Sequence, residues 1–265
     1  MDNIIVYYIN LDKKTERNTN VLQKLNFLGF KNENIKRFSA INGINLKTDL
    51  INKNYINNEI INLLQNKNIN IRLGELSCSL SHYFIYEEII NDERITDDTI
   101  IFIFEDDFFI NEKYLNENSF ISIINDLHDF NKNEWDLIYM GGRFEIGFTI
   151  NNINESNLYE KLYKNFYKKN NNLNNKQFNY HTDRTTHNYI IQKKTAIKLK
   201  NICKNSYTIN NFFVIDNILN YLKKEDNLKI IDYFPHIFYS PINYITDIQN
   251  DFSIINTSEL TTNII

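Results

Sequence analysis

The sequence predicts an α/β fold, and two features of its hydrophobic pattern support this. Residues 4–9 (IIVYYI) form an unbroken apolar run, a helical pattern follows, and residues 37–41 (RFSAI) form a second β-prone run, which together give a strand, helix, strand opening. Residues 100–104 (IIFIF) are again apolar without a break, which is typical of a strand buried on both faces. We therefore expect a sheet that contains parallel strands and is flanked by helices.

The first expected helix covers about residues 14–28, and Gly29 ends it. Its apolar residues recur at helical spacing, at Val21, Leu22, Leu25 and Leu28. An Asn42-Gly43 turn follows the second strand, and residues 46–70 carry a weak helical pattern. A longer helix is expected over about residues 74–90, with an apolar stripe at Leu76, Leu80, Tyr83 and Phe84.

The second half of the chain continues the alternation of helices and strands. The pattern predicts a helix at 120–130, a strand at 135–140 that enters a glycine turn at 141–142, a strand at 186–191, a helix at 193–202 and a strand at 228–234. We expect a single domain over residues 1–265. Within it, residues from about 151 to 180 are rich in Asn and Lys and are expected to form a polar lid or acceptor-binding insertion, and about 249–265 a tail.

Composition excludes several classes of protein. Lys and Arg number 29 against 33 Asp and Glu, for a net charge of −4, and there is no sustained basic tract, so nucleic acid is not an expected partner. No stretch approaches the roughly 20 apolar residues that span a bilayer. Cys78 and Cys203 cannot define a disulfide framework or a zinc site, and are expected to be buried small hydrophobic residues or thiols outside any disulfide.

The acidic triplet Glu105, Asp106 and Asp107 directly follows the buried strand at 100–104. Two carboxylates about 4 Å apart repel by roughly 4 kcal/mol at an effective dielectric near 20, so such a cluster needs solvent or a cation. A hard divalent cation that keeps open positions could hold a substrate diphosphate there. From these residues alone, a solvated junction between strand and loop is an equal alternative.

Other polar residues fall where open α/β sheets bind ligands. Asn10 ends the first strand and Arg17 lies on the next helix, where a guanidinium can grip phosphate, although a lone Arg is more often a surface charge. Gly74 begins the long helix and indicates a close backbone approach. By themselves, Glu75 and His82 are explained as a helix-capping carboxylate and a structural histidine.

Several motifs occur in one order along the chain. They are 8–11 (YINL) with Arg17, 74–78 (GELSC) followed by 80–83 (LSHY), 104–107 (FEDD), 135–139 (WDLIY), 188–191 (NYII) with Ala196, 214–216 (VID) and 239–247 (YSPINYITD). This set is similar to the motifs of glycosyltransferase family 25, which includes bacterial lipooligosaccharide galactosyltransferases and procollagen galactosyltransferases. The similarity covers nearly the whole chain.

The resemblance implies a glycosyltransferase A-type fold, with a Rossmann-like mixed sheet flanked by helices and a metal-binding acidic motif. It implies a UDP-sugar donor, Mn²⁺ or another divalent cation, and an inverting reaction. Asp107 is the expected metal ligand and Glu105 contacts the ribose or a metal-bound water. Asp216 is the expected general base, with a helix N-cap as its alternative role.

The nucleotide and the donor have expected contacts as well. Asn10, Arg17 and Asp106 are expected beside the nucleotide, and Gly74 and Glu75 near the donor sugar.

The sequence departs from the family pattern in its last segments. Asn243 stands roughly where the family has a histidine, and we expect it to be the third metal ligand through its carbonyl oxygen, with His236 as the alternative. Val214 replaces the proline that precedes the catalytic acid, which concerns local geometry and not the acid itself.

Residues 135–139 and the tail are more similar to the procollagen branch. The expected reaction is transfer of galactose from UDP-galactose to hydroxylysine of a collagen-like polypeptide. UDP-glucose as donor and a lipooligosaccharide-type glycan as acceptor are the alternatives, because selection between epimeric sugars depends on one or two hydrogen bonds.

Two other classes of protein fit these residues less well. An inactive sugar-nucleotide-binding module would have lost the acids that are present here. A metal-dependent nuclease would show a basic surface, whereas the lysines at 161–176 form only a short patch. With neither a signal peptide nor a membrane span, we expect a soluble protein of the cytoplasm or a viral factory, with the endoplasmic reticulum as the alternative.

Overall fold

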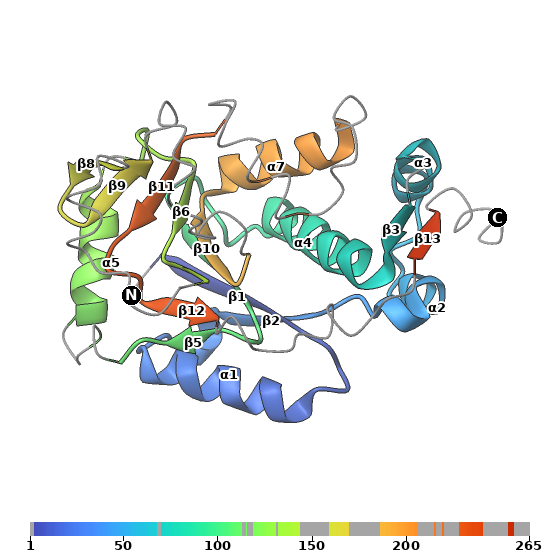
Figure 1. Ribbon diagram of the computed structural model, residues 1–265, viewed down its shortest axis with the longest axis horizontal. Helices are drawn as coiled ribbons and strands as arrows, with labels where there is room; N and C mark the ends of the chain where they lie inside the picture. The colour runs from blue at the N-terminus through green and yellow to red at the C-terminus, as the bar shows by residue number, and fades with distance from the viewer. Residues whose placement is uncertain are drawn as a thin grey trace, which may run out of the picture.

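An eight-stranded sheet organises the computed structural model (Figure 1), which describes residues 3–67, 70–112, 115, 119–130, 132–143, 159–169, 186–205, 215, 219, 228–240 and 254–256. The order of its strands is β2-β1-β4-β10-β6-β11-β9-β8. Their bounds are β1 Ile4–Asn10, β2 Ile35–Ser39, β4 Ile100–Glu105, β6 Leu137–Tyr139, β8 Tyr159–Tyr163, β9 Phe166–Lys169, β10 Asn188–Ile191 and β11 Ile230–Tyr233.

The sheet is mixed, and its direction changes beside the acidic triplet. Strands β2, β1 and β4 are parallel, so that Ile9 of β1 pairs with Glu105 of β4. Strand β10 runs antiparallel to β4, and Asn188 pairs with Phe104. The carboxyl ends of β1 and β4 and the amino end of β10 therefore meet at one edge of the sheet, as ligand sites of open α/β sheets require.

Helices cover both faces of the sheet (Figure 1). Their bounds are α1 Thr15–Phe27, α2 Leu46–Asn52, α3 Asn58–Lys67, α4 Leu73–Asn91, α5 Ser119–Asp129 and α7 Lys193–Asn205, with 3₁₀ turns η1 Asn32–Asn34 and η2 Gly43–Asn45. Alternate residues of β4 face opposite sides: Ile101 and Ile103 pack with α4 and α7, whereas Phe102 packs with α1 and α5. This two-sided burial explains the continuous apolar run in β4.

Helix α4 is buried along most of its length although it carries three serines, Ser77, Ser79 and Ser81, within little more than one turn. The hydroxyl of Ser77 donates to Leu73 O at 2.7 Å, and that of Ser81 donates to Ser77 O at 2.8 Å. Ser79 Oγ accepts from the backbone of Ile215 at 3.0 Å. These bonds satisfy the buried hydroxyls, so α4 can lie against the sheet with a polar segment facing β4.

Two smaller sheets complete the described fold. Strands β5 (Phe109–Ile110), β12 (Phe238–Ser240) and β7 (Gly141–Arg143) form one, and β3 (Asn70–Arg72) pairs with β13 (Ile254–Asn256) in the other.

The expectation of a glycine turn at 141–142 was wrong, because Gly141 begins β7, which pairs in parallel with β12. An added Cβ on Gly141 would lie 2.1 Å from Phe238 O, so this glycine permits close strand approach.

Other boundaries differ from expectation in smaller ways. Strand β2 begins and ends two residues earlier than the expected strand at 37–41. Residues 159–169, inside the segment expected to be a lid or insertion, form the hairpin β8–β9, which extends the large sheet. Among the described residues, no helix is both long and apolar enough to cross a membrane.

Candidate functional site

The acidic triplet lies between side chains from three neighbouring elements. Strand β1 brings Asn10 beside Asp106, and the segment before β10 brings His187 beside Glu105 and Asp107. The backbone N–H of Glu105 donates to His187 O at 2.9 Å, which fixes this juxtaposition. The site therefore follows directly from the strand order.

Asp106 faces the side of β1 and α1. Asn10 Nδ2 donates to Asp106 Oδ2 at 2.7 Å, and Arg17 Nη1 donates to Asp106 Oδ1 at 3.1 Å. Burial raises the pKa of Asp106, and the contacts with Asn10 and Arg17 oppose this only in part. Asn10, Arg17 and Asp106 thus lie in direct contact at the end of β4, and their contact with a nucleotide stays a prediction.

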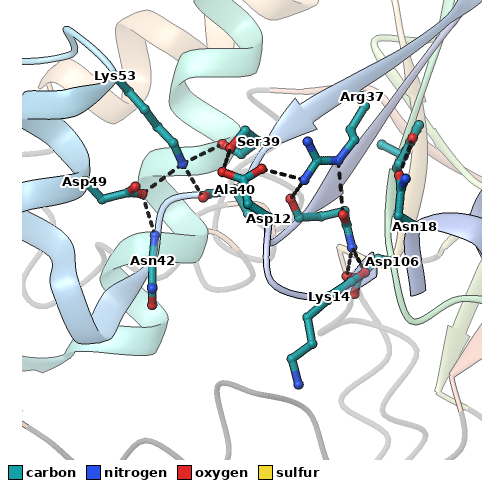
Figure 2. A network of polar contacts seen from close by, with 12 residues as sticks. Asp12, Lys14, Asn18, Arg37, Ser39, Ala40, Asn42, Asp49, Lys53 and Asp106 are labelled. Atoms are coloured by element: carbon teal, nitrogen blue, oxygen red, sulfur yellow. Dashed lines mark hydrogen bonds and ion pairs between the residues drawn. The ribbon is translucent and has the colours of Figure 1, made fainter. Parts of the chain in front are cut away.

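Arg37 of β2 holds Asn10 in place, a role that the sequence did not indicate. Figure 2 shows the guanidinium of Arg37 beside the carboxylate of Asp12. Arg37 donates to Asn10 Oδ1 at 3.1 Å, to Asn10 O at 3.2 Å and to Asp12 Oδ1 at 2.6 Å. Because Arg37 occupies the amide oxygen of Asn10, the amide nitrogen is left to point at Asp106.

The same network continues away from the triplet (Figure 2). Ser39 donates to Asp12 Oδ2 at 2.8 Å, and Lys53 donates to Ala40 O at 2.7 Å and to Asp49 Oδ2 at 2.9 Å. These bonds tie the loops after β1 and β2 to α2, and they give Asn10 a rigid support.

Asp107 is 5% exposed and lies on the other side of the triplet. Its Oδ1 is 3.2 Å from His187 Nδ1, which is also 3.7 Å from Glu105 Oε2. Burial lowers the pKa of His187, but the two carboxylates outweigh it and raise this pKa to about 10. His187 Nε2 is buried and has no hydrogen-bond partner among the described residues.

Glu105 is also contacted from α4. Its Oε1 lies 3.3 Å from His82 Nε2 and 3.9 Å from Cys78 Sγ, and it accepts a hydrogen bond from Thr186 Oγ1. Burial favours the neutral acid, yet His187 and His82 hold the pKa of Glu105 well below its usual value. Glu105 is therefore an ionised carboxylate surrounded by donors.

Two groups in this region have the composition and spacing of metal sites. One consists of Glu105, Asp107 and His187, and the other of Cys78, His82 and Glu105; the ligand atoms of each lie within 4.8 Å of one another. The first set offers two carboxylates and an imidazole, which suits Mn²⁺ and similar divalent cations. The imidazole atom that faces both carboxylates is Nδ1 of His187.

The remaining expected residues are distributed as follows. Gly74 is buried in the first turn of α4, and its carbonyl accepts from Ser77 Oγ at 3.1 Å. Glu75 is half-buried and shares a helix face with Cys78 and His82, at positions i, i+3 and i+7. Asp216 and Asn243 lie outside the described residues. His236 is buried and stacked on Phe234, and it belongs to neither metal-type group.

His187 is a member of the described group that sequence reasoning missed, and Asn188 is the buried polar residue next to it. His187 precedes β10 and is some eighty residues from the triplet in the sequence, and only the antiparallel pairing of β10 with β4 brings it there. Asn188 is buried, and neither polar atom of its side chain has a partner among the described residues. Both face the region where β4, β7 and β10 come together.

The fold and this acidic site define a protein of the glycosyltransferase A type, a mixed α/β sheet with a possible cation site at a strand end. The family model described as glycosyltransferase family 25 (LPS biosynthesis protein) matches residues 3–219. The chain belongs to glycosyltransferase family 25, and it is a glycosyltransferase. A search of curated proteins found no match.

Proposed function

We propose that this glycosyltransferase transfers galactose from UDP-galactose, with a divalent cation and inversion at the anomeric carbon. The observation that carries the proposal is the convergence of Asn10, Arg17 and Asp106 with the group of Glu105, Asp107 and His187 at the carboxyl end of β4. The side of the triplet that carries Asn10 and Arg17 offers hydrogen-bond donors for a nucleotide diphosphate. The side that carries the carboxylates and the imidazole offers ligands for its cation.

Asp107, Glu105 and His187 are the residues that would hold the cation, with Mn²⁺ as the expected ion. A bound divalent cation acts as a Lewis acid that stabilises the negative charge on a diphosphate leaving group. Asn243 stays a proposed additional ligand. His187 belongs to the described group with Glu105 and Asp107, whereas the sequence had suggested Asn243 or His236 as the third metal ligand.

Arg17 and Asn10 are proposed to position the nucleotide. A guanidinium forms two parallel hydrogen bonds with a phosphate, and the side chain of Arg17 is already oriented by its ion pair with Asp106. Asp106 keeps Arg17 and Asn10 oriented. Gly74 and Glu75 remain proposed contacts of the donor sugar.

Asp216 is the proposed general base, which takes the proton of the acceptor hydroxyl as that oxygen attacks. Its neighbour in sequence, Ile215, is buried, and its backbone N–H is bonded to Ser79 of α4, one residue from Cys78. This anchor supports a role for the 214–216 segment at the site. Positioning of acceptor and donor contributes much of the rate enhancement.

The acceptor is proposed to be hydroxylysine in a collagen-like polypeptide, on the similarity of residues 135–139 and 239–247 to procollagen galactosyltransferases. A glycan acceptor is the second candidate, because the matching family model is described as an LPS biosynthesis protein. The alternative donor, UDP-glucose, is tested in the same experiment.

The decisive experiment measures UDP release with Mn²⁺, using UDP-galactose and UDP-glucose in parallel. The acceptors are a hydroxylysine-containing collagen peptide and a lipooligosaccharide-type glycan. We expect release above hydrolysis with UDP-galactose and the peptide, and none with Asp107→Ala. Release only with the glycan would move the proposal to the second acceptor, and absence of UDP binding would overturn it.

A further inference from the structure

The two oxygens of Glu105 face different groups of ligand atoms. Oε2 lies on the side of His187, at 3.7 Å from its Nδ1, whereas Oε1 is near Cys78 Sγ at 3.9 Å and His82 Nε2 at 3.3 Å. The second set contains a thiol, which the reaction proposed above does not use. Its position beside a buried carboxylate calls for a chemical role.

We propose that Cys78, His82 and Glu105 form a second metal site, specific for a borderline-soft divalent cation such as Zn²⁺. Zinc binds sulfur, nitrogen and oxygen ligands at about 2.0–2.3 Å in a tetrahedron, so its ligand atoms are separated by roughly 3.3–3.7 Å. The measured separations of 3.3 and 3.9 Å from Glu105 Oε1 are close to these values. The third pair, Cys78 Sγ and His82 Nε2, lies within 4.8 Å, so the three atoms surround one common point.

The helix presents the thiol and the imidazole together. Cys78 and His82 are four residues apart on α4, so they lie on the same face one turn apart. His82 has no solvent exposure, and α4 is packed along its length, so the imidazole is fixed before any ion binds. Cys78 is only half-buried, which gives an ion access from solvent.

The second ring nitrogen of His82 has a hydrogen-bonding partner, as the second nitrogen of a metal-binding histidine usually does. His82 Nδ1 is 2.7 Å from Tyr189 Oη, which is itself 2.9 Å from Tyr86 Oη. Such an outer contact sets the tautomer and ring orientation of a metal ligand. It leaves Nε2, the atom nearest Glu105, as the one available to the ion.

The two groups are expected to prefer different ions, because their ligand atoms differ. A thiolate favours Zn²⁺ over Mn²⁺, while a set of carboxylates with one imidazole accepts Mn²⁺. Because both groups use Glu105, an ion in one changes the charge available to the other. Zinc at Cys78 and His82 is therefore expected to weaken Mn²⁺ binding at Asp107 and His187. This coupling rests on the proposed function, whereas the zinc-type site itself does not.

The test uses Co²⁺ as a spectroscopic substitute for Zn²⁺ on the full chain after removal of metals by a chelator. We expect a thiolate-to-cobalt charge-transfer absorption that saturates at one cobalt per chain. It should be lost in Cys78→Ser and kept in Cys203→Ser, because Cys203 is a buried core residue outside the group. Asp107→Asn should also keep it.

A milder variant distinguishes loss of the metal site from loss of the fold. Tyr189→Phe removes only the hydroxyl beside His82, and it should weaken cobalt binding about tenfold while the circular dichroism spectrum stays unchanged. No charge-transfer band in the wild-type chain, or a band that survives in Cys78→Ser, would overturn the site.

The coupling between the two groups has its own measurement. Free Mn²⁺ is followed by electron paramagnetic resonance while Zn²⁺ is added. Releasing half of the bound Mn²⁺ should require about tenfold more Zn²⁺ in Cys78→Ser than in the wild type. Equal requirements would refute the coupling. If the wild type binds no Mn²⁺ at all, the proposed cation of the reaction fails, and the cobalt band still decides the zinc-type site.

Discussion

Asp106 differs chemically from the acids on either side of it. Its partners are Asn10 and Arg17, which belong to β1 and α1, whereas Glu105 and Asp107 share His187. Glu105 ends β4, whereas Asp106 and Asp107 form the turn that follows it. The turn directs the carboxylate of Asp106 to Asn10 and Arg17, and those of Glu105 and Asp107 to His187. This division follows from local backbone geometry and is independent of which sugar is transferred.

Removal of Arg17 tests whether the side of the triplet that faces β1 and α1 binds the nucleotide. Arg17→Ala should weaken UDP binding about ten- to hundredfold, because a hydrogen bond to a charged group contributes about 1.5–3 kcal/mol. Isothermal titration calorimetry with UDP measures this. Arg94→Ala is the matched control, since Arg94 is 64% exposed and pairs with Asp92 beyond the end of α4. Equal UDP affinity of the two variants would show that Arg17 does not contact the nucleotide.

Tyr7 gives a pH-dependent prediction away from the site. Burial raises the pKa of this tyrosine in the middle of β1, and the charge of Glu88 adds to the effect while Arg94 opposes it. Because the folded pKa is above the unfolded value near 10, the stability contribution is complete below pH 10 and is lost as pH rises. Between pH 8 and 11, wild type should lose about 1.4 kcal/mol more free energy of unfolding than Tyr7→Phe.

Urea unfolding of both proteins at the two pH values measures that difference. The comparison cancels the other titrating groups, which the two chains share. If the gap between wild type and Tyr7→Phe is the same at pH 8 and pH 11, Tyr7 ionises normally in the folded protein.

At the scale of elements, the order and direction of the strands assemble the site. The β1, α1, β2 opening and β4 were predictable because their apolar runs and helical spacing are long and uninterrupted. Asn10 and the triplet were predictable for the same reason, since they end those strands. His187 and Arg37 were not, because their positions depend on the register of β10 against β4 and of β2 against β1.

Short strands were the other source of error. Residues 141–143 contain two glycines and read as a turn, yet they pair with β12 some hundred residues later. No local pattern encodes such a pairing, because a three-residue strand has too few side chains to show alternation. The hairpin β8–β9 was missed similarly, since neither of its short strands, YEKLY and FYKK, alternates polar with apolar residues.

Gly141 and Gly43 offer a test of close packing between elements. A Cβ on Gly141 would lie 2.1 Å from Phe238 O and 2.6 Å from Asn188 Nδ2, whereas one on Gly43 would lie 2.9 Å from both Leu73 O and Ser77 Oγ. Overpacking typically costs 1–3 kcal/mol. We expect Gly141→Ala to reach at least about 3 kcal/mol and Gly43→Ala about 1 kcal/mol.

Chemical denaturation of the two variants ranks these costs. The Gly141 contact is with a backbone carbonyl of a paired strand, which cannot move without breaking β7–β12, whereas part of the Gly43 contact is a side-chain hydroxyl. A larger loss for Gly43→Ala would contradict this packing.

On the scale of the whole molecule, the site connects the two hydrophobic cores. Strand β4 contributes to both, α4 belongs to the core on one face, and α1 belongs to the core on the other. Glu105, Asp107 and His187 lie where β4 and β10 adjoin, so an ion held by them joins the two halves of the sheet. Binding there is therefore expected to stabilise the entire fold.

Mn²⁺ should raise the thermal stability of the folded chain in proportion to its occupancy. At a free concentration a hundred times Kd, a ligand specific for the folded state adds about 2.7 kcal/mol, which corresponds to roughly 5–10 °C in Tm for a domain of this size. Asp107→Ala and His187→Gln should each remove most of the Mn²⁺-dependent shift. Asp98→Ala is the control, because Asp98 is an exposed acid paired with Lys132 outside the site. A full Mn²⁺ shift in Asp107→Ala would place the cation elsewhere, and a full shift in His187→Gln alone would leave the carboxylates as ligands without the imidazole.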